Sequence, residues 1–241
     1  MTFILLGIIT GLVSGFFGVG GGMILVPMLL LSGFDMKSAV AISIMQMVFS
    51  SIYGTLLNYK KNKDILEDGI IIGLGGFLGG SFSGVIVPRI DGEYLKYLFL
   101  FIVLLSIIRI YFTPKEHRKV GKKHNKPALV LIGFIIGIIA MSIGVGGAVI
   151  LIPILTGYMF YKLKDATSLG LIFVIFSSIA GFISLSVSGH MLYNEGFIIG
   201  IGSLIGVFFG IMLKENIHIK SYKNLTLGLY VFIIVSICLK L

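Results

Sequence analysis

Two glycine-rich runs are the residues of this chain whose types and spacing could do chemistry. The first is Gly18-Val19-Gly20-Gly21-Gly22, followed by Pro27, and the second is Gly144-Val145-Gly146-Gly147, followed by Ala148 and Pro153. Consecutive glycines are poor helix formers, so each run predicts a helix break. A half-helix beginning near Gly21 or Gly147 would direct free backbone N–H groups and the positive end of its dipole into the break. The runs therefore predict an anion site that needs no charged side chain.

Hydroxyl and amide side chains could complete this site, because such donors suit an oxyanion in a medium of low dielectric constant. The candidates are Ser43, Gln46, Ser50 and Ser51 in the first half of the chain, and Thr167, Ser168, Ser177 and Ser178 in the second. Each serine has a structural alternative, a hydrogen bond to its own helix backbone. Gln46 is the exception, because an amide deep in a membrane is costly without a partner. With Gly20 to Gly22 and Gly146 to Ala148, these side chains form the predicted substrate site.

The other side chains argue against an enzyme. The glycine runs are not nucleotide-binding loops, because no strand precedes them, no acidic residue follows at the expected distance and no Walker lysine is present. A membrane enzyme would need converging His, Cys, Asp or Glu residues, and the sequence indicates none. The sole cysteine, Cys238, has no partner for an intramolecular disulfide. We predict no catalytic residue, no metal and no other cofactor.

The elements that position these residues must lie in a membrane. Hydrophobic residues make up 57% of the 241 positions, the mean hydropathy is +1.09 and only 12% of residues are charged. Residues 1–34 and 69–87 contain no Asp, Glu, Lys or Arg. About 20 apolar residues are enough to cross a bilayer core of roughly 30 Å. The fold class is therefore an all-α integral membrane protein, and we expect the apolar amino terminus to be retained.

The hydrophobic segments fall into two halves. They cover residues 3–31, 38–57, 69–87 and 94–112, then 128–159, 166–188, 196–213 and 225–239. A basic linker, 114–127, separates the halves 1–113 and 128–241. An offset of 126 aligns the two glycine runs, and an offset of 127 aligns Phe49-Ser50-Ser51-Ile52 with Phe176-Ser177-Ser178-Ile179. Identical residues occur in the same order in both halves, at nearly the same offset. This pattern indicates an internal duplication, as in transporters built from paired repeats.

Other glycines are spaced for helix packing. Gly75, Gly79 and Gly84, with Gly80, lie in the first half, and Gly202, Gly206 and Gly210 lie in the second. Small residues spaced by four let transmembrane helices approach closely. We therefore predict packing roles for these glycines and central positions for their two segments.

The distribution of basic residues predicts the topology. Segment 3–31 would be about 43 Å long as one straight helix, so it should break and turn back as a re-entrant hairpin, as should its counterpart. Fifteen of the 19 Lys and Arg residues then lie on one side, including the linker, and only Lys37, Arg89, Lys96 and Lys240 lie on the other. Because basic residues favour the cytoplasm, we expect inverted repeats, both termini outside and a cytoplasmic linker.

The paired motifs resemble the sulfite exporter TauE/SafE family of membrane anion permeases. The resemblance rests on both glycine runs with their prolines and on Ala166-Thr167-Ser168-Leu169, and it covers nearly the whole chain. It implies export or uptake of sulfite, sulfonates or other small sulfur-containing or organic anions at the cytoplasmic membrane. Two positions depart from the pattern: Ile42 stands where the first half would match Thr167, and Ala148 replaces a third glycine.

The sequence thus predicts a permease for a small anion, with the lipid bilayer as its surroundings. Nucleic acid is not an expected partner, because the net charge of +9 comes from basic residues in short connections between apolar segments. An anion channel and a non-transporting membrane anchor subunit stay open as alternatives. The anion, the direction of flux, the coupling ion and the oligomeric state are not determined at this stage.

Overall fold

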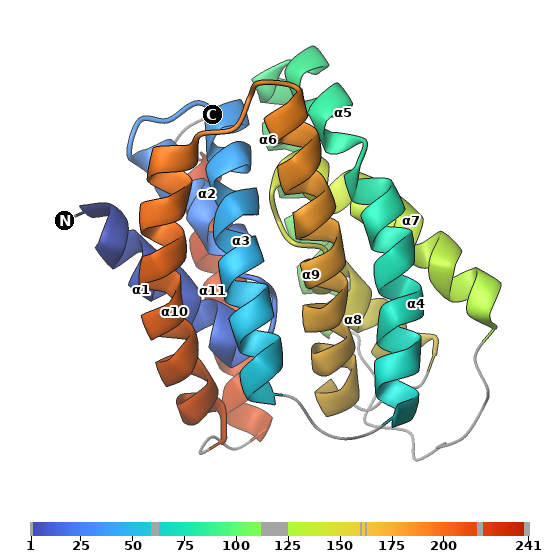
Figure 1. Ribbon diagram of the computed structural model, residues 1–241. Helices are drawn as coiled ribbons and strands as arrows, with labels where there is room; N and C mark the ends of the chain where they lie inside the picture. Colours follow the sequence, from blue (N-terminus) through green and yellow to red (C-terminus); the bar gives the residue numbers. More distant parts are fainter. Residues whose placement is uncertain are drawn as a thin grey trace.

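The computed structural model describes residues 2–58, 63–111, 125–159, 161, 163–215 and 219–238. Within these residues every element is a helix (Figure 1). The first-half helices are α1 (Thr2–Phe17), α2 (Gly22–Leu31), α3 (Met36–Asn58), α4 (Lys63–Gly80), α5 (Ser83–Arg89) and α6 (Gly92–Tyr111). Those of the second half are α7 (Lys126–Ile143), α8 (Ala148–Gly157), α9 (Leu163–Val187), α10 (Tyr193–Glu215) and α11 (Ile219–Cys238).

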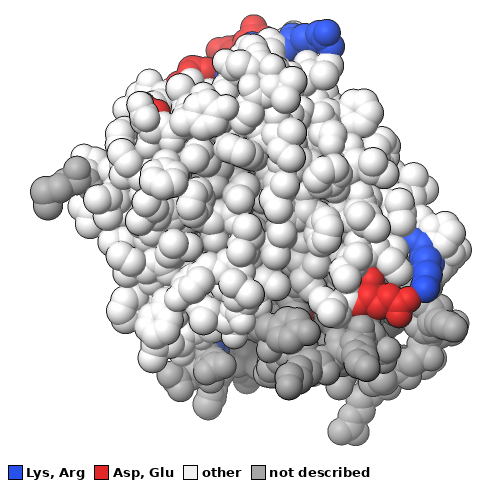
Figure 2. Space-filling model, viewed as in Figure 1, with Lys and Arg blue, Asp and Glu red and all other residues white. Residues whose placement is uncertain are grey.

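The lengths and surface of these helices fit an integral membrane protein. Five stretches among the described residues are long and apolar enough to span a bilayer: Met36–Leu57, Leu66–Arg89, Lys126–Ile143, Asp165–Val187 and Tyr193–Lys214. Figure 2 shows coloured charged residues at the upper and lower ends of this face and an uncharged surface between them. Such a band can face lipid without burying charge. The prediction of a multi-pass, all-α membrane protein is confirmed.

The first hydrophobic segment breaks where its glycine run predicts. Helix α1 ends at Phe17, and α2 begins at Gly22. Between them Gly18, Gly20 and Gly21 have φ angles of 71°, 81° and 83°, a region that residues with a Cβ enter only at a cost. The ring centroids of Phe3 and Phe34 lie 6.1 Å apart. The start of α1 and the end of α2 therefore lie together, so this segment turns back on itself.

The second break has the same local geometry. Gly144, Gly146 and Gly147 have φ angles of 70°, 85° and 70° between α7 and α8. At the start of α7, Lys126 Nζ lies 2.6 Å from a Glu67 carboxylate oxygen in α4. These contacts place the start of α7 beside the beginning of α4.

The end of α8 is close to the same part of α4. Just beyond α8, the Tyr161 hydroxyl donates a 2.5 Å hydrogen bond to Asp68. Burial, together with this hydrogen bond and the carboxylate charge, raises the pKa of Tyr161. The α7–α8 segment therefore also turns back at its glycine break, and both of its ends lie at the end of the molecule where α4 begins.

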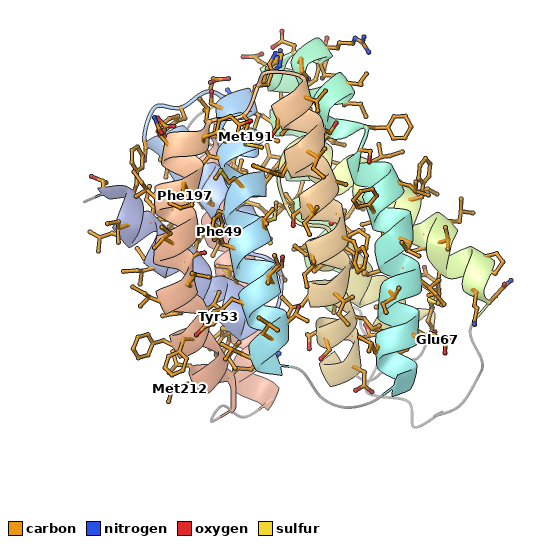
Figure 3. The ribbon with its side chains drawn as sticks, viewed as in Figure 1. Phe49, Tyr53, Glu67, Met191, Phe197 and Met212 are labelled. Atoms are coloured by element: carbon orange, nitrogen blue, oxygen red, sulfur yellow. The ribbon has the colours of Figure 1, made fainter. Side chains whose placement is uncertain are left out.

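Helices α3 and α9 pack against each other, and each of them packs against one further long helix. Helix α3 packs on α10, and α9 packs on α4 (Figure 1). Figure 3 shows Phe49 of α3 facing Phe197 of α10, with ring centroids 5.6 Å apart. A Cβ built on Gly200 would lie 2.5 Å from the Phe49 ring, and one built on Gly73 would lie 2.5 Å from the Phe176 ring. Glycine thus makes room for one aromatic ring at each of these helix crossings.

Close glycine contacts attach each broken segment to a continuous span. Helix α1 packs on α10, and α7 packs on α4. A Cβ on Gly206 would lie 2.0 Å from the Ile8 carbonyl oxygen, and one on Gly79 would lie 2.1 Å from the Phe134 carbonyl oxygen. The predicted packing roles are confirmed for Gly75, Gly79, Gly80, Gly84, Gly202, Gly206 and Gly210. Glycines on the facing helices that make similar close contacts were not predicted: Gly7, Gly11 and Gly15 in α1, and Gly133 and Gly137 in α7.

The structure adds an interruption to one predicted segment and corrects one boundary. The predicted segment 69–87 lies within the span Leu66–Arg89, but α4 ends at Gly80 and α5 begins at Ser83. The Ser184 hydroxyl of α9 donates to the Ser81 carbonyl at 2.5 Å and accepts the Gly84 N–H at 2.9 Å. These bonds satisfy backbone groups at the interruption. Helix α7 begins at Lys126, inside the predicted linker 114–127, most of which lies outside the described residues.

Replacing Gly206 by Ala should destabilise the protein. Its Cβ would collide with the Ile8 carbonyl oxygen, 2.0 Å away, and such overpacking costs about 1–3 kcal/mol. Gly228→Ala is the matched control, because a Cβ at Gly228 in α11 meets nothing within 4 Å. Thermal unfolding of the detergent-purified variants should give a lower midpoint for Gly206→Ala only. Equal midpoints would contradict the packing assignment.

Candidate functional site

The two glycine breaks meet inside the protein. A Cβ on Gly22 would lie 2.2 Å from the Gly144 carbonyl oxygen, and one on Gly146 would lie 3.0 Å from the Val19 carbonyl oxygen. All four residues are buried. Backbones this close leave no space for a side chain at Gly22, so this position requires glycine.

Helices α3 and α9 each contribute an apolar side chain to the junction. The Met47 sulfur would lie 2.9 Å from a Cβ on Gly22 and 2.7 Å from one on Gly146. Val174 Cγ1 would lie 2.9 Å from a Cβ on Gly20. The sequence analysis missed Met47 and Val174, because an apolar residue in an apolar segment carries no distinguishing signal. The offset of 127 that relates the halves also relates these two residues.

Both returning half-helices begin at this junction. Their N-cap residues, Gly21 and Gly147, adopt left-handed conformations and provide no side-chain cap. Neither Gly22 nor Met23 donates its backbone N–H to a residue that the structure describes. Free N–H groups at the positive end of a buried helix form an arrangement that stabilises an anion.

Ser43 and Ser50 satisfy carbonyl groups of the breaks. The Ser43 hydroxyl donates to the Gly144 carbonyl at 2.7 Å, a contact between the two halves of the chain. The Ser50 hydroxyl donates to the Gly20 carbonyl at 3.0 Å. Both predicted residues therefore contact the breaks, with their hydroxyl hydrogens used by backbone oxygens.

Gln46 points at the first break. Its side chain is fully buried, and a Cβ on Gly21 would lie 2.9 Å from Gln46 Nε2 and 3.0 Å from Oε1. Neither amide atom has a hydrogen-bond partner among the residues that the structure describes. A buried unpaired amide lowers the stability of the fold by about 1–3 kcal/mol. Stability alone therefore does not explain a glutamine at this position.

The candidates on α9 are placed differently. Ser177 donates to the Phe173 carbonyl at 3.0 Å, and Ser178 donates to the Ile175 carbonyl at 3.3 Å. Both bonds lie within α9, as the structural alternative predicts. Ser168 is partly buried one position after Thr167.

Thr167 contacts the beginning of the first break. Its Cβ would lie 3.4 Å from a Cβ on Gly18, and its hydroxyl accepts a 3.4 Å hydrogen bond from Lys214 Nζ in α10. The equivalent contact in the other half is made by Val40, whose Cα would lie 3.1 Å from a Cβ on Gly144. The contacts thus relate Thr167 to Val40, at the offset of 127, rather than to Ile42.

Ser51 and the two prolines are the remaining predicted residues. The Ser51 hydroxyl is buried and has no hydrogen-bond partner among the described residues. Pro27 and Pro153 lie within the returning half-helices α2 and α8, one at an equivalent position in each. Among the described part of the chain, no group of three or more His, Cys, Asp and Glu residues is arranged to hold a metal ion.

Comparison with known proteins gives the family. The model of the sulfite exporter TauE/SafE family matches residues 3–237. The chain belongs to this family. The TauE/SafE resemblance of the glycine runs is therefore confirmed over nearly the whole sequence, and the protein is a membrane transporter rather than an enzyme.

Relatives of this TauE/SafE protein are named as transporters. A probable membrane transporter protein of Methanocaldococcus jannaschii is 30% identical over 211 residues, which cover 83% of this chain and 75% of the relative. The probable membrane transporter protein YdhB of Bacillus subtilis is 24% identical over 235 residues, 94% of this chain and 96% of the relative. The names of these relatives specify no substrate.

Replacing Ser43 by Ala should weaken the contact between the halves. The change leaves the buried Gly144 carbonyl without its 2.7 Å hydrogen bond, at a cost of about 1–3 kcal/mol. Ser177→Ala is the control, because its hydroxyl bonds only within α9 and such bonds add little stability. Thermal midpoints should fall for Ser43→Ala and stay near wild type for Ser177→Ala. The reverse order would contradict this role of Ser43.

Proposed function

We propose that this protein is a permease for small anions, with sulfite, sulfonates or other sulfur-containing or organic anions as its substrates. The observation that carries the proposal is the meeting of two helix breaks, each beginning a half-helix, in the buried centre of the molecule. Transporters commonly bind anionic groups at the N-termini of such discontinuous helices. The anion would be held near the bilayer midplane by backbone N–H groups of Gly20 to Gly22 and Gly146 to Ala148.

A charge-free site suits an anion that must also leave. Backbone dipoles stabilise negative charge in a medium of low dielectric constant, whereas a buried Lys or Arg would itself need a partner in the membrane. Surrounding hydroxyl and amide groups on α3 and α9 would adjust the site.

The same proposal includes inverted repeats. The two ends of the α1–α2 segment lie together near Phe34, and the two ends of the α7–α8 segment lie beside the start of α4. Helix α1 packs on α10, and α7 packs on α4, so each half covers the broken segment of the other. These exchanges support two halves of opposite orientation. The distribution of basic residues supports both termini outside and the 114–127 linker in the cytoplasm.

A non-transporting anchor subunit is the alternative class. An anchor has no need for two interrupted helices that meet in its centre, since unbroken helices satisfy their own backbone groups in lipid. The costly break geometry therefore favours the permease.

Transport by purified protein tests the proposal. Proteoliposomes should take up labelled sulfite, thiosulfate or sulfoacetate saturably, and Gly21→Ala and Gly147→Ala should each lower the rate at least about 10-fold, because a left-handed residue with a Cβ costs about 1–2 kcal/mol and crowds the site. Gly33→Ala is the control, since Gly33 has a φ of 96° with nothing within 4 Å of its Cβ position. No flux of any anion, with either sign of membrane potential or pH gradient, would contradict the permease.

Cysteine labelling tests the orientation. In a Cys238→Ser background, Glu93→Cys at the start of α6 should react with an impermeant maleimide added outside intact cells. Lys126→Cys at the start of α7 should react only after the cells are opened. Both native side chains are exposed. Labelling of both positions from one side, or a cytoplasmic carboxy-terminal tag, would contradict the inverted arrangement.

A further inference from the structure

The two breaks are related in backbone but have different surroundings. Near the first break, a Cβ on Gly21 would meet the Gln46 amide and, at 3.1 Å, the Thr10 carbonyl oxygen. One turn after Thr10 on α1, the Ser14 hydroxyl is buried and has no hydrogen-bond partner among the described residues. The first break therefore has polar groups from both α1 and α3.

The second break has apolar groups at the corresponding places. A Cβ on Gly147 would lie 2.4 Å from the Phe173 ring and 3.1 Å from the side chains of Ala140 and Ile136. The offset of 127 relates Phe173 to Gln46, and the offset of 126 relates Ala140 and Ile136 to Ser14 and Thr10. Two polar side chains of the first half, Gln46 and Ser14, thus have apolar counterparts, Phe173 and Ala140, in the second half.

The backbone N–H groups of the two breaks also differ in whether they already donate a hydrogen bond. At the second break the Ala148 N–H donates to the Gly146 carbonyl at 2.8 Å. Its counterpart in the first break, the Gly22 N–H, has no such acceptor among the described residues. The first break therefore has one more donor available for a ligand.

A basic side chain is linked to the first break through Thr167. Lys214 Nζ donates to the Thr167 hydroxyl, and Thr167 packs against Gly18. The corresponding glycine of the second break, Gly144, packs against Val26 and Val40. The residues that pack on these two equivalent glycines thus include a polar side chain at the first break and only valines at the second.

The unpaired Gln46 amide indicates which hydrogen-bonding groups the ligand carries. Both its Nε2 and its Oε1 are unpaired, so the argument is the same whichever way the amide is oriented. Nε2 needs an acceptor, and Oε1 needs a donor. An oxyanion with no hydrogen on oxygen or nitrogen satisfies only the first requirement, whereas one that keeps a hydroxyl, an acidic proton or an ammonium group satisfies both.

We propose that the first break supplies the side-chain hydrogen bonds of the anion site, that Gln46 selects an oxyanion carrying its own hydrogen-bond donor, and that the second break forms the less polar side of the same site. This inference rests on the proposed anion transport. It predicts that the two halves, though alike in backbone, contribute unequally to affinity.

The test compares Gln46→Leu with its counterpart Phe173→Leu in proteoliposomes given labelled sulfite. Gln46→Leu should raise the KM for uptake roughly 10- to 100-fold, the range expected for lost hydrogen bonds to a charged group. Phe173→Leu, which removes no polar group, should raise the KM by a clearly smaller factor than Gln46→Leu does. Ligand-free Gln46→Leu should unfold at the same temperature as wild type or higher, because it loses a buried unpaired amide.

The outcomes separate this inference from the permease proposal. If wild-type protein moves no anion, the proposed function fails. If wild-type flux is saturable but Gln46→Leu keeps its KM, or if Phe173→Leu raises the KM as much, only the unequal half-sites are overturned. A lower unfolding temperature for ligand-free Gln46→Leu would overturn the ligand-binding role by assigning Gln46 to the fold.

A matched pair of sulfonates tests the donor requirement. Ethanesulfonate and 2-hydroxyethanesulfonate carry the same charge and differ by one hydroxyl group. As competitors of sulfite uptake, the hydroxylated anion should be at least about 5-fold more effective with wild type, a ratio within the range for one hydrogen bond. The preference should disappear in Gln46→Leu. Equal competition in wild type, or the same preference in the variant, would contradict selection by Gln46.

Discussion

Interrupted helices in a buried, apolar centre leave backbone groups that must find partners, and this constraint organises the structure. Each free N–H or C=O group that finds no partner in such a centre is costly. The carbonyls of Gly144 and Gly20 receive hydroxyl hydrogens from Ser43 and Ser50. The N–H groups at the start of α2 receive nothing comparable from the described residues. A bound anion would complete the set of hydrogen bonds at the break.

Glycine packing brings the breaks to the centre. Helices α1 and α7 are each held against a continuous span, α10 and α4, at a distance that only glycine permits on both sides of the contact. The breaks then face each other between α3 and α9, with Met47 and Val174 beside them. Because these helices carry their charges at the ends (Figure 2), the electrostatics of the centre depend on backbone dipoles and uncharged polar side chains. The transporter function of the family is consistent with such a centre.

Much of this architecture could be predicted from the sequence, because glycine acts through local conformation. The run from Gly18 to Gly22 cannot continue a helix, so its break was predictable, and the repeat placed the second break. The interruption between α4 and α5 was not predictable, because it depends on Ser184, about one hundred positions away in the chain. The unequal surroundings of the breaks also required the structure. The offset relates Gln46 to Phe173, but only the fold places both side chains beside the breaks.

The central claim is that an anion binds between the helix breaks. A crystal structure of the protein soaked with selenite, an analogue of sulfite, would test it through the anomalous scattering of selenium. The account predicts an anomalous peak within hydrogen-bond distance of the Gln46 amide and the Gly22 N–H. Peaks confined to the charged ends of the helices, at a concentration that inhibits sulfite uptake, would contradict it.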